Sequence, residues 1–488
     1  MTYRISYKVL GLMLMTSFAH AQEIPNWQHK DLAKDSLFGI STDKGYALLK
    51  GKTAKPVVVG VIDSGVDTLH EDLTGALWVN PKKKSFDNGT YGWSYIGSAK
   101  GNVHYDNLEL TRQVRQVEQR DTTKLSPAEM TTYHAEKQSL VKQLAEASNM
   151  VNGIGNFKAI LESMERKIGK PELKFVDLQA YPPVGPGETQ VRETVLKMLN
   201  GGADYAAFKH EQLDEVIAHF KSLVDYHLNL SYDPRSVVGD HYFDSKERNY
   251  GTGDVMGPDA EHGTHVAGII CAVRGNGIGL DGIADKVRIL AVRAVPDGDE
   301  RDKDIANAIR YAADHGVSVI NMSFGKAYSQ DKKAVDEAIA YALKKDVLLV
   351  QAAGNDNKNI DSAANFPRRV SASLAYIVVG ASGLKDDTTL KAPFSNYGKS
   401  SVDVFAPGVQ IYSSVPGSKY AYHDGTSMAA PVVTGVAALI REYYPKLSAL
   451  QVKEIILKSV VKRDLLAPYC VTGGVVNAYK ALQLAATY

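Results

Sequence analysis

The chain has 488 residues, of which 44% are hydrophobic and 23% charged, so its composition is that of an ordinary globular protein and excludes wholesale disorder. Its 56 Lys and Arg residues almost balance its 55 Asp and Glu residues, and a net charge of +1 gives no general attraction to nucleic acid or to anionic membranes. The two cysteines are too few for a disulfide scaffold or a cysteine-rich zinc module. We therefore expect a folded chain with a hydrophobic core and no nucleic-acid partner.

Residues 1–21 have the pattern of a secretory signal peptide. Arg4 and Lys8 precede the apolar run 9–15, and Ala19-His20-Ala21 offers small residues at the two positions that are read for cleavage. The alternative, a single membrane anchor, needs about 20 apolar residues, and this run is too short. We predict export to the periplasm or the medium, with no membrane span in the remaining chain.

Five later segments are apolar throughout rather than alternating between apolar and polar residues. Strands that are buried on both faces have this pattern, which favours a parallel sheet covered by helices. The five segments are 57–62, 287–292, 317–320, 347–350 and 377–379. Residues 304–315 and 332–345 repeat apolar positions at helical spacing between the later strands. This order predicts an α/β fold with a doubly wound, mostly parallel sheet and helices on both faces.

The stretch 104–250 differs because it contains four helical patterns and no strand-like run. The apolar stripes fall within 130–144, 157–168, 191–199 and 213–223. Residues 181–187 contain three prolines, so we expect this segment not to be helical. We predict an all-α subdomain over 104–250 that is inserted between 22–103 and 251–488. The alternative is a set of surface helices without a core of their own.

Three residues lie where a predicted element begins or ends and can carry chemistry. Asp63 follows the first predicted strand, at the carboxyl edge where open α/β sheets hold their sites. His262 lies at the start of a predicted buried helix that continues through 266–273. Ser427 lies in the first turn of a second apolar helix, for which Thr426 is the expected N-cap. The positive end of that helix dipole favours a developing oxyanion beside Ser427.

A metal site at His262 is an alternative, because His262 and His265 lie three positions apart on one helix face. A zinc-protease helix needs histidines four positions apart, with a glutamate beside the first, and this segment lacks that pattern. For His265 we expect a packed, hydrogen-bonded side chain rather than a reactive one.

Asp63, His262 and Ser427 together provide the groups needed for acyl transfer. A serine hydroxyl is a poor nucleophile unless an imidazole takes its proton, and a buried carboxylate fixes the tautomer of that imidazole. The order Asp, His, Ser differs from the order in α/β-hydrolases, and Ser427 lacks the Gly-x-Ser-x-Gly elbow of such an esterase.

The segments around these residues resemble the Asp, His and Ser motifs of the subtilisin-like serine proteases, or subtilases. They are Val61-Ile62-Asp63-Ser64-Gly65-Val66-Asp67, His262-Gly263-Thr264-His265-Val266-Ala267-Gly268 and Gly425-Thr426-Ser427-Met428-Ala429-Ala430-Pro431. The resemblance covers 22–103 and 251–488 and none of the helical insertion. It implies a secreted serine endopeptidase that acts on proteins or peptides. Ser427 would form the acyl-enzyme, His262 would be the general base and acid, and Asp63 would orient His262.

The resemblance implies further site residues. Asn355 lies in a segment that looks like the oxyanion segment of the family and would donate its side-chain amide to the tetrahedral oxygen. Residues 321–325 resemble the strand that binds an extended substrate. The residues expected to line the cleft and the primary pocket are Ser323, Phe324, Gly325, Ala353 and Gly354. These segments contain no acidic residue that would select a basic side chain, so we expect an apolar or broad preference.

Two of these assignments have simpler alternatives. Asn355 follows a glycine and has the sequence context of an ordinary turn residue, and Phe324 has the character of a core residue.

Asp72 matches a calcium-ligand position in many subtilases, and the loop 275–280 resembles the loop that completes that site. Calcium takes six to eight oxygen ligands, of which the sequence identifies only a part. A structural calcium at Asp72 is therefore an expectation, and no cofactor is expected for catalysis itself.

The long insertion departs from the compact members of the family. By connectivity it leaves and returns near the cleft, so it can cap the cleft, bind a partner or hold the enzyme inactive. The segment 22–63 is shorter than the roughly 50 residues of a small domain, which leaves no room for a separate inhibitory prodomain. We therefore hypothesise that the insertion restrains activity.

The alternative function is a catalytically retired scaffold that binds or regulates a partner through the insertion. All four reactive positions are filled, and a retired site has no chemical need to keep them. Export makes a disulfide between Cys271 and Cys470 chemically permissible, but Cys271 lies in a predicted buried helix, and the pairing stays open.

Overall fold

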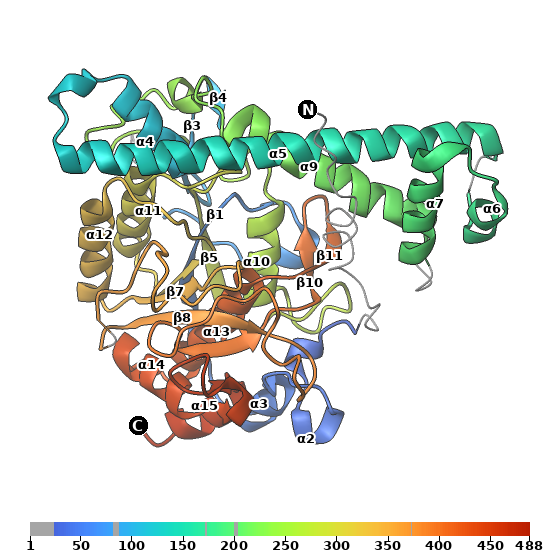
Figure 1. Cartoon of the computed structure of the whole chain (residues 1–488). Coiled ribbons are helices and arrows are strands. Elements are labelled where there is room, and N and C mark those ends of the chain that lie inside the picture. The colour runs from blue at the N-terminus through green and yellow to red at the C-terminus, as the bar shows by residue number, and fades with distance from the viewer. Residues whose placement is uncertain (1–23, 82–86, 171–172, 200–203, 372) are drawn as a thin grey trace. The chain divides into compact units, whose positions relative to one another are not determined.

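The computed structural model describes residues 24–81, 87–170, 173–199, 204–371 and 373–488 (Figure 1). The predicted signal peptide, 1–21, lies outside the described residues. The described chain divides into two compact units. The α/β unit comprises Ile24–Glu109 and Asp233–Tyr488, and the helical unit comprises Leu110–Tyr232. Each unit is described by itself.

A nine-stranded, mostly parallel sheet forms the centre of the α/β unit (Figure 1). Its strand order is β12-β13-β9-β8-β7-β6-β1-β5-β2. The strands are β1 (Val57–Asp63), β2 (Gly92–Ser94), β5 (Val287–Arg293), β6 (Val319–Met322), β7 (Leu348–Ala352), β8 (Tyr376–Ser382), β9 (Val404–Pro407), β12 (Val461–Lys462) and β13 (Gly474–Val475). β1 pairs in parallel with both β5 and β6, and β12 runs antiparallel to β13. All five predicted strands are present, and the predicted α/β fold class is confirmed.

Helices cover both faces of the sheet, which explains why its strands are apolar throughout. Val59 and Val61 of β1 belong to one core with α10 (Glu261–Cys271) and α13 (Thr426–Tyr443). Ile62 belongs to a second core with α11 (Asp302–Asp314) and α12 (Lys332–Lys344). Successive β1 residues therefore face opposite layers. The remaining named helices of this unit are α2 (Leu32–Asp35), α3 (Thr42–Leu49), α14 (Ala449–Lys458) and α15 (Ala478–Ala485).

Two antiparallel hairpins, which the sequence pattern did not predict, complete the α/β unit. They are β3 (Gly97–Ser98) with β4 (Gly101–Asn102), and β10 (Ile411–Val415) with β11 (Lys419–His423). Cys271 and Cys470 are both buried and free, so they form no disulfide in this structure. None of the helices in the described part of the chain has both the length and the apolar character needed to cross a membrane.

The helical unit is built on one 42-residue helix, α5 (Pro127–Ile168), which contains both of the first two predicted apolar stripes. The other α-helices are α4 (Glu109–Glu118), α6 (Phe175–Ala180), α7 (Gly185–Leu199), α8 (Tyr205–Ala207) and α9 (Glu215–Ser222). π-Helical segments, Phe208–Asp214 and Leu223–His227, flank α9.

The helical unit has a hydrophobic core of its own, so the alternative of surface helices without a core is wrong. Its buried members are Ile154, Phe157, Leu161, Met164, Leu173, Leu178, Val191, Val195, Leu199, Tyr205, Phe208 and Leu213. One local prediction was also wrong, because α7 begins at Gly185 inside the segment 181–187 that was expected not to be helical. Pro186 is then the second helical residue, where the missing N–H of a proline removes no intrahelical hydrogen bond.

The helical unit is shorter than the predicted insertion 104–250, because residues 104–109 and 233–250 belong to the α/β unit. Ion pairs of the buried Arg301 side chain fix both flanking segments. The Arg301 guanidinium donates to Asp106 over 2.7 and 2.8 Å and to Asp233 over 3.1 Å. One side chain therefore holds the segment that leads to the helical unit and the segment that returns from it.

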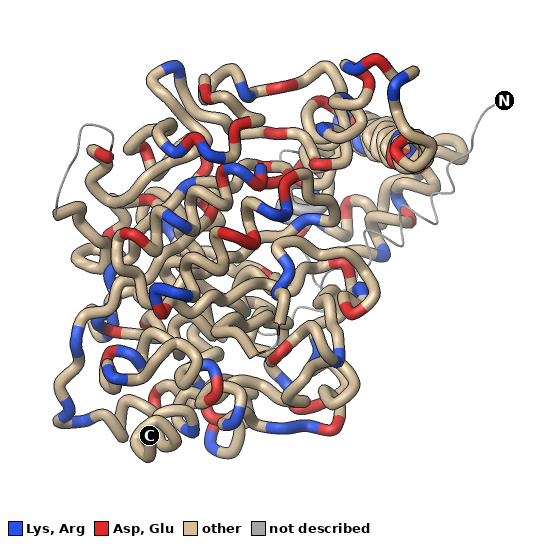
Figure 2. Tube along the Cα trace, turned by 90° about the vertical axis from the view of Figure 1, so that its left-hand side faces the viewer, with Lys and Arg blue, Asp and Glu red and all other residues tan. Residues whose placement is uncertain are grey.

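A second arginine fixes the returning segment further. Arg235 donates to Asp304 over 2.6 Å and to Asp240 over 2.7 Å. Figure 2 shows acidic and basic residues interspersed along the chain, in keeping with this pairing and with the near-zero net charge.

Candidate active site

Asp63 and His262 meet at the carboxyl end of β1. Asp63 is the last residue of that strand and is only 2% exposed. Its Oδ1 accepts a hydrogen bond from the Ser64 N–H over 2.8 Å and lies 2.7 Å from Nδ1 of His262, the second residue of α10. A side chain on Gly263 would place a Cβ 2.0 Å from the Gly65 carbonyl oxygen. Glycine at 263 thus allows α10 to come close enough to the turn after β1 for this contact to form.

The contact determines which nitrogen of His262 is available for chemistry. A carboxylate only accepts, so Nδ1 carries the proton toward Asp63 and Nε2 is left as the base. Burial lowers the pKa of His262. The carboxylates of Asp63, Asp259 and Glu261, with Asp63 the largest contributor among them, raise that pKa by more, so its net shift is upward. The His262 side chain remains 39% exposed, so its imidazole is accessible from solvent.

Ser427 is the second residue of α13, and its backbone lies at the positive end of that helix. Its Oγ donates to the Ser323 carbonyl over 3.2 Å, and the Ser323 Oγ donates back to the Ser427 carbonyl over 2.8 Å. Among the described residues, no hydrogen bond joins Ser427 to His262. Catalytic hydrogen bonds are often long or poorly aligned until substrate binds. The structure thus joins two of the three predicted residues directly and places the third at the start of its helix.

Asn355 follows β7 and is held by Thr426. Its Oδ1 accepts from the Thr426 N–H over 2.9 Å and from the Thr426 Oγ1 over 2.8 Å. These bonds occupy the amide oxygen and leave Nδ2 as a donor. Nδ2 lies beside Gly425, 3.6 Å from where a Cβ on that residue would stand. An amide donor is therefore fixed two residues from Ser427, which is the arrangement an oxyanion site needs.

Thr426 is a site residue whose role the sequence analysis missed. The N-cap of α13 is Gly425, so the predicted N-cap at Thr426 is wrong by one position. The Thr426 hydroxyl instead bonds to Asn355 and accepts from the Gly354 N–H over 3.0 Å. The sequence shows only that a hydroxyl residue precedes Ser427, and this pattern does not distinguish a cap from a long-range contact.

The residues predicted to line the substrate cleft directly follow the ends of two neighbouring parallel strands, β6 and β7, which pair with one another. Asn365 joins the segments that follow the two strands. Its Nδ2 donates to the Ala353 carbonyl over 3.3 Å, and its Oδ1 lies 3.1 Å from where a Cβ on Gly325 would stand. A cavity of about 160 Å³ is lined in part by Gln351, Asn365 and Arg368. The preference of the site for apolar side chains stays a prediction.

Phe324 is only 8% exposed and packs in the hydrophobic core that contains α11 and α12. This position favours the alternative in which Phe324 is a core residue. Its role as a wall of the cleft stays a prediction.

His265 has a structural role in the α/β unit. Its Nε2 lies 3.0 Å from the Ile411 carbonyl and 3.2 Å from the Ala421 carbonyl, and its ring stacks on that of His423 at 4.2 Å between centroids. Burial, together with His423, lowers the pKa of His265 well below its usual value. The expectation of a packed and hydrogen-bonded histidine therefore agrees with the structure.

Asp72 is buried in a 3₁₀ turn, Glu71–Leu73, and its carboxylate is already hydrogen-bonded. Oδ1 accepts from Asn276 Nδ2 over 2.7 Å, and Oδ2 accepts from the Leu280 N–H over 3.2 Å. A calcium ion would need those oxygens together with further oxygen ligands, and here both oxygens are engaged by hydrogen bonds. The described residues include no group of three or more His, Cys, Asp or Glu side chains that could hold a metal ion. The structural calcium stays a prediction.

Comparison with known proteins places this geometry in a family. The family model of the subtilase family matches residues 54–474. A thermophilic serine proteinase from Bacillus sp. strain AK1 is 40% identical over 292 residues, which are 59% of this chain and 67% of the relative. Thermitase from Thermoactinomyces vulgaris is 41% identical over 223 residues, which are 46% of this chain and 75% of the relative.

A solved protease structure from Pseudoalteromonas arctica PAMC 21717 shares the fold. Its TM-score is 0.51 at 21% identity, and the match covers 94% of this chain and 98% of the other. The chain therefore belongs to the subtilase family, the subtilisin-like serine proteases.

Proposed function

We propose that the protein is an exported serine endopeptidase that cleaves peptide bonds through an acyl-enzyme on Ser427. The observation that carries this proposal is the contact of 2.7 Å between His262 Nδ1 and Asp63 Oδ1, which leaves the second imidazole nitrogen as a base. The amide of Asn355, oriented by Thr426, supports it.

In the proposed first half-reaction, Ser427 Oγ attacks the carbonyl carbon of the scissile peptide while its proton passes to His262 Nε2. The imidazolium that forms is stabilised by the buried carboxylate of Asp63. The negative charge on the carbonyl oxygen is stabilised by Asn355 Nδ2 and by the dipole of α13. His262 then gives its proton to the leaving amine, the C–N bond breaks, and the acyl group remains on Ser427.

In the second half-reaction, water attacks the acyl carbon. His262 takes a proton from the water and returns one to Ser427 Oγ as the ester bond breaks. Peptide hydrolysis needs no oxidant and no metal in this scheme.

Replacement of the nucleophile tests the proposal. Purified wild-type protein should react with a serine-directed phosphonate and hydrolyse peptides, and the Ser427→Ala variant should do neither while keeping the circular dichroism spectrum of the wild type. A folded wild-type protein that is not labelled would instead support the alternative of a retired scaffold acting through the helical unit.

The same proposal includes export. Support comes from Arg4, Lys8, the apolar run 9–15 and the small residues before Gln22. Expression in a bacterial host followed by N-terminal sequencing should give a mature protein that starts at Gln22 outside the cytoplasm. An uncleaved protein that stays in the cytoplasm would contradict export.

A further inference from the structure

Lys326 lies at the end of the segment 323–325, which is predicted to bind substrate. Its backbone joins that segment to the one that follows Asn365. The Lys326 N–H donates to the Phe366 carbonyl over 2.9 Å, and the Phe366 N–H donates to the Lys326 carbonyl over 2.8 Å. The Lys326 side chain turns into the interior of the α/β unit and is only 1% exposed.

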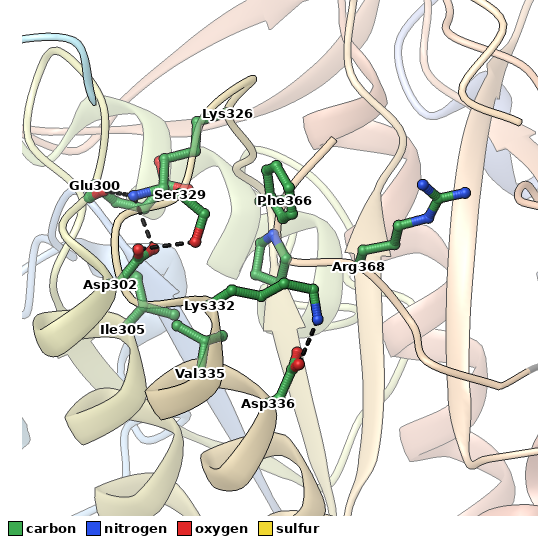
Figure 3. A pocket seen from close by; sticks show the side chains of 11 residues that line it. Glu300, Asp302, Ile305, Lys326, Ser329, Lys332, Val335, Asp336, Phe366 and Arg368 are labelled. Carbon is green, nitrogen blue, oxygen red and sulfur yellow. Dashed lines mark hydrogen bonds and ion pairs between the residues drawn. The ribbon is translucent and has the colours of Figure 1, made fainter. Parts of the chain in front are cut away.

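The buried ammonium group lies beside Glu300 and Asp302 (Figure 3), and Glu109 also contacts it. Nζ lies 2.9 Å from Glu109 Oε2, 2.8 Å from Asp302 Oδ1 and 2.6 Å from the Glu300 carbonyl oxygen. An ammonium has three N–H donors, so this set can satisfy all of them. Asp302 is itself fixed, because its Oδ2 accepts from Ser329 Oγ over 2.9 Å.

Glu109 links this cluster to the helical unit. It is the last residue of the α/β unit before the chain enters Leu110–Tyr232, and it is also the first residue of α4. Its side chain is buried against Lys326, and its backbone N–H donates to Asp299 Oδ2 over 2.7 Å. One lysine side chain therefore connects the end of the segment 323–325, the loop before α11 and the last residue of the α/β unit before the helical unit.

Stability alone is a weak reason for this arrangement. A buried ion pair is often no more stabilising than apolar side chains of similar volume, because both charges lose their hydration. The position of the pair is informative, since its lysine directly follows the three residues expected to contact substrate.

We propose that Lys326 is a positioning residue, whose ion pairs with Glu109 and Asp302 hold the segment 323–325 in the conformation that binds an extended peptide. Glu109, the last residue of the α/β unit before the chain enters the helical unit, is thereby coupled to substrate affinity. This inference rests on the proposed peptidase function. It assigns no role in bond cleavage to Lys326, so the reactivity of Ser427 should not depend on it.

The test compares Lys326→Met and Glu109→Gln with wild type. Lys326→Met removes the charge while keeping an unbranched side chain, and Glu109→Gln keeps the shape of its partner. For an extended peptide substrate, KM should rise about tenfold in both variants. The kcat value and the rate of Ser427 labelling by a small phosphonate should stay within about threefold of wild type.

Lys332→Met is the matched control, because Lys332 and Lys326 both line one pocket beside α12 (Figure 3). It pairs with Asp336 on α12, where the two side chains are 43% and 30% exposed. The KM of the Lys332→Met variant should equal that of wild type.

An unchanged KM in folded Glu109→Gln overturns the inference, even where Lys326→Met fails to fold. A loss of labelling that parallels the loss of peptide hydrolysis also overturns it, because that result indicates general damage to the site. Failure of wild type to react with the phosphonate overturns the proposed function as well, whereas normal labelling with an unchanged KM overturns this inference alone.

Discussion

Nδ1 of His262 lies 2.7 Å from Oδ1 of Asp63, although 199 positions separate the two residues in the chain. The contact forms because β1 ends at Asp63 and α10 begins beside it, with Gly263 removing the side chain that would keep them apart. The whole helical unit lies between these two positions in the sequence, and Asp63 and His262 are nevertheless in contact.

Asp63→Asn should lower kcat by about 10⁴-fold, because an amide no longer fixes the productive tautomer of His262 or stabilises its charged form. The pH–rate profile gives a second readout. His262 must be neutral to accept the Ser427 proton, so activity falls as the pH drops through the His262 pKa. That pKa is raised in wild type, which places the acid limb above the usual histidine value of about 6.5. In Asp63→Asn the limb should move to lower pH, and an unmoved limb would show that another group controls it.

Asn355→Leu should lower kcat about 100- to 1000-fold with little change in KM, because the amide donor acts on charge that develops only in the transition state. Steady-state kinetics on a peptide substrate measure the two parameters separately. A purely structural role in the turn predicts a fall in melting temperature with kcat retained, and that result would contradict the oxyanion assignment.

Thr426→Val should reduce kcat about tenfold, since it removes the hydroxyl that donates to Asn355 and accepts from the Gly354 N–H. Thr426→Ser keeps the hydroxyl and loses only a methyl group, so it serves as the control and should remain close to wild type. A loss in Thr426→Ser, with activity retained in Thr426→Val, would show that packing of the methyl group matters rather than the hydrogen bonds.

Glu442→Gln should stabilise the protein at pH 8 and leave it unchanged near pH 4. Burial, aided by Asp285, raises the pKa of Glu442 to about 9 from an ordinary 4.5. Between these values the folded protein keeps the proton and the unfolded chain loses it, so stability falls as the pH rises. Glutamine avoids this loss and should raise the free energy of unfolding by about 1–3 kcal/mol at pH 8.

Urea denaturation at the two pH values measures the effect of Glu442→Gln, with Glu454→Gln on the exposed face of α14 as the control. A Glu442→Gln variant that is equally or less stable than wild type at pH 8 would contradict the raised pKa.

Removal of the helical unit tests the hypothesis that it restrains activity. A variant in which a short Gly-Ser linker joins Glu109 to Asp233 should turn over a small peptide substrate faster than wild type. Both proteins should first be shown to fold by circular dichroism and to react at Ser427. Unchanged or lower turnover in a folded deletion variant would count against restraint.

Much of the α/β unit could be predicted from the sequence because the central strands are buried on both faces of the sheet. A strand covered on both faces must be apolar at every position, as in β1, and that pattern is visible without any partner. The sequence likewise predicted that Asp63 ends a strand and that His262 and Ser427 each lie at the start of a buried helix. The parts that were missed depend on contacts between distant segments. The bonds from Thr426 to Asn355 are an example, because nothing in the local sequence distinguishes them from capping.

The helical unit shows a second limit of sequence patterns. The apolar positions of α5 fall into two stripes, and the sequence does not reveal that one continuous helix carries both. The compact helical unit, Leu110–Tyr232, is narrower than the predicted insertion 104–250. The residues that tie the flanking segments to the α/β unit are charged, and a buried ion pair such as that of Arg301 with Asp106 has the sequence character of a solvated surface.

The ion pairs of Arg301 with Asp106 and Asp233 affect how the protein tolerates changes in the length of the inserted segment. The two ends of the inserted chain meet at a single guanidinium, so the α/β unit itself maintains their proximity. The entropy of closing a loop grows only slowly with its length once its ends are anchored. Lengthening, shortening or exchanging the intervening segment should therefore perturb the folding of the surrounding sheet little, which makes this junction a natural point for grafting foreign domains.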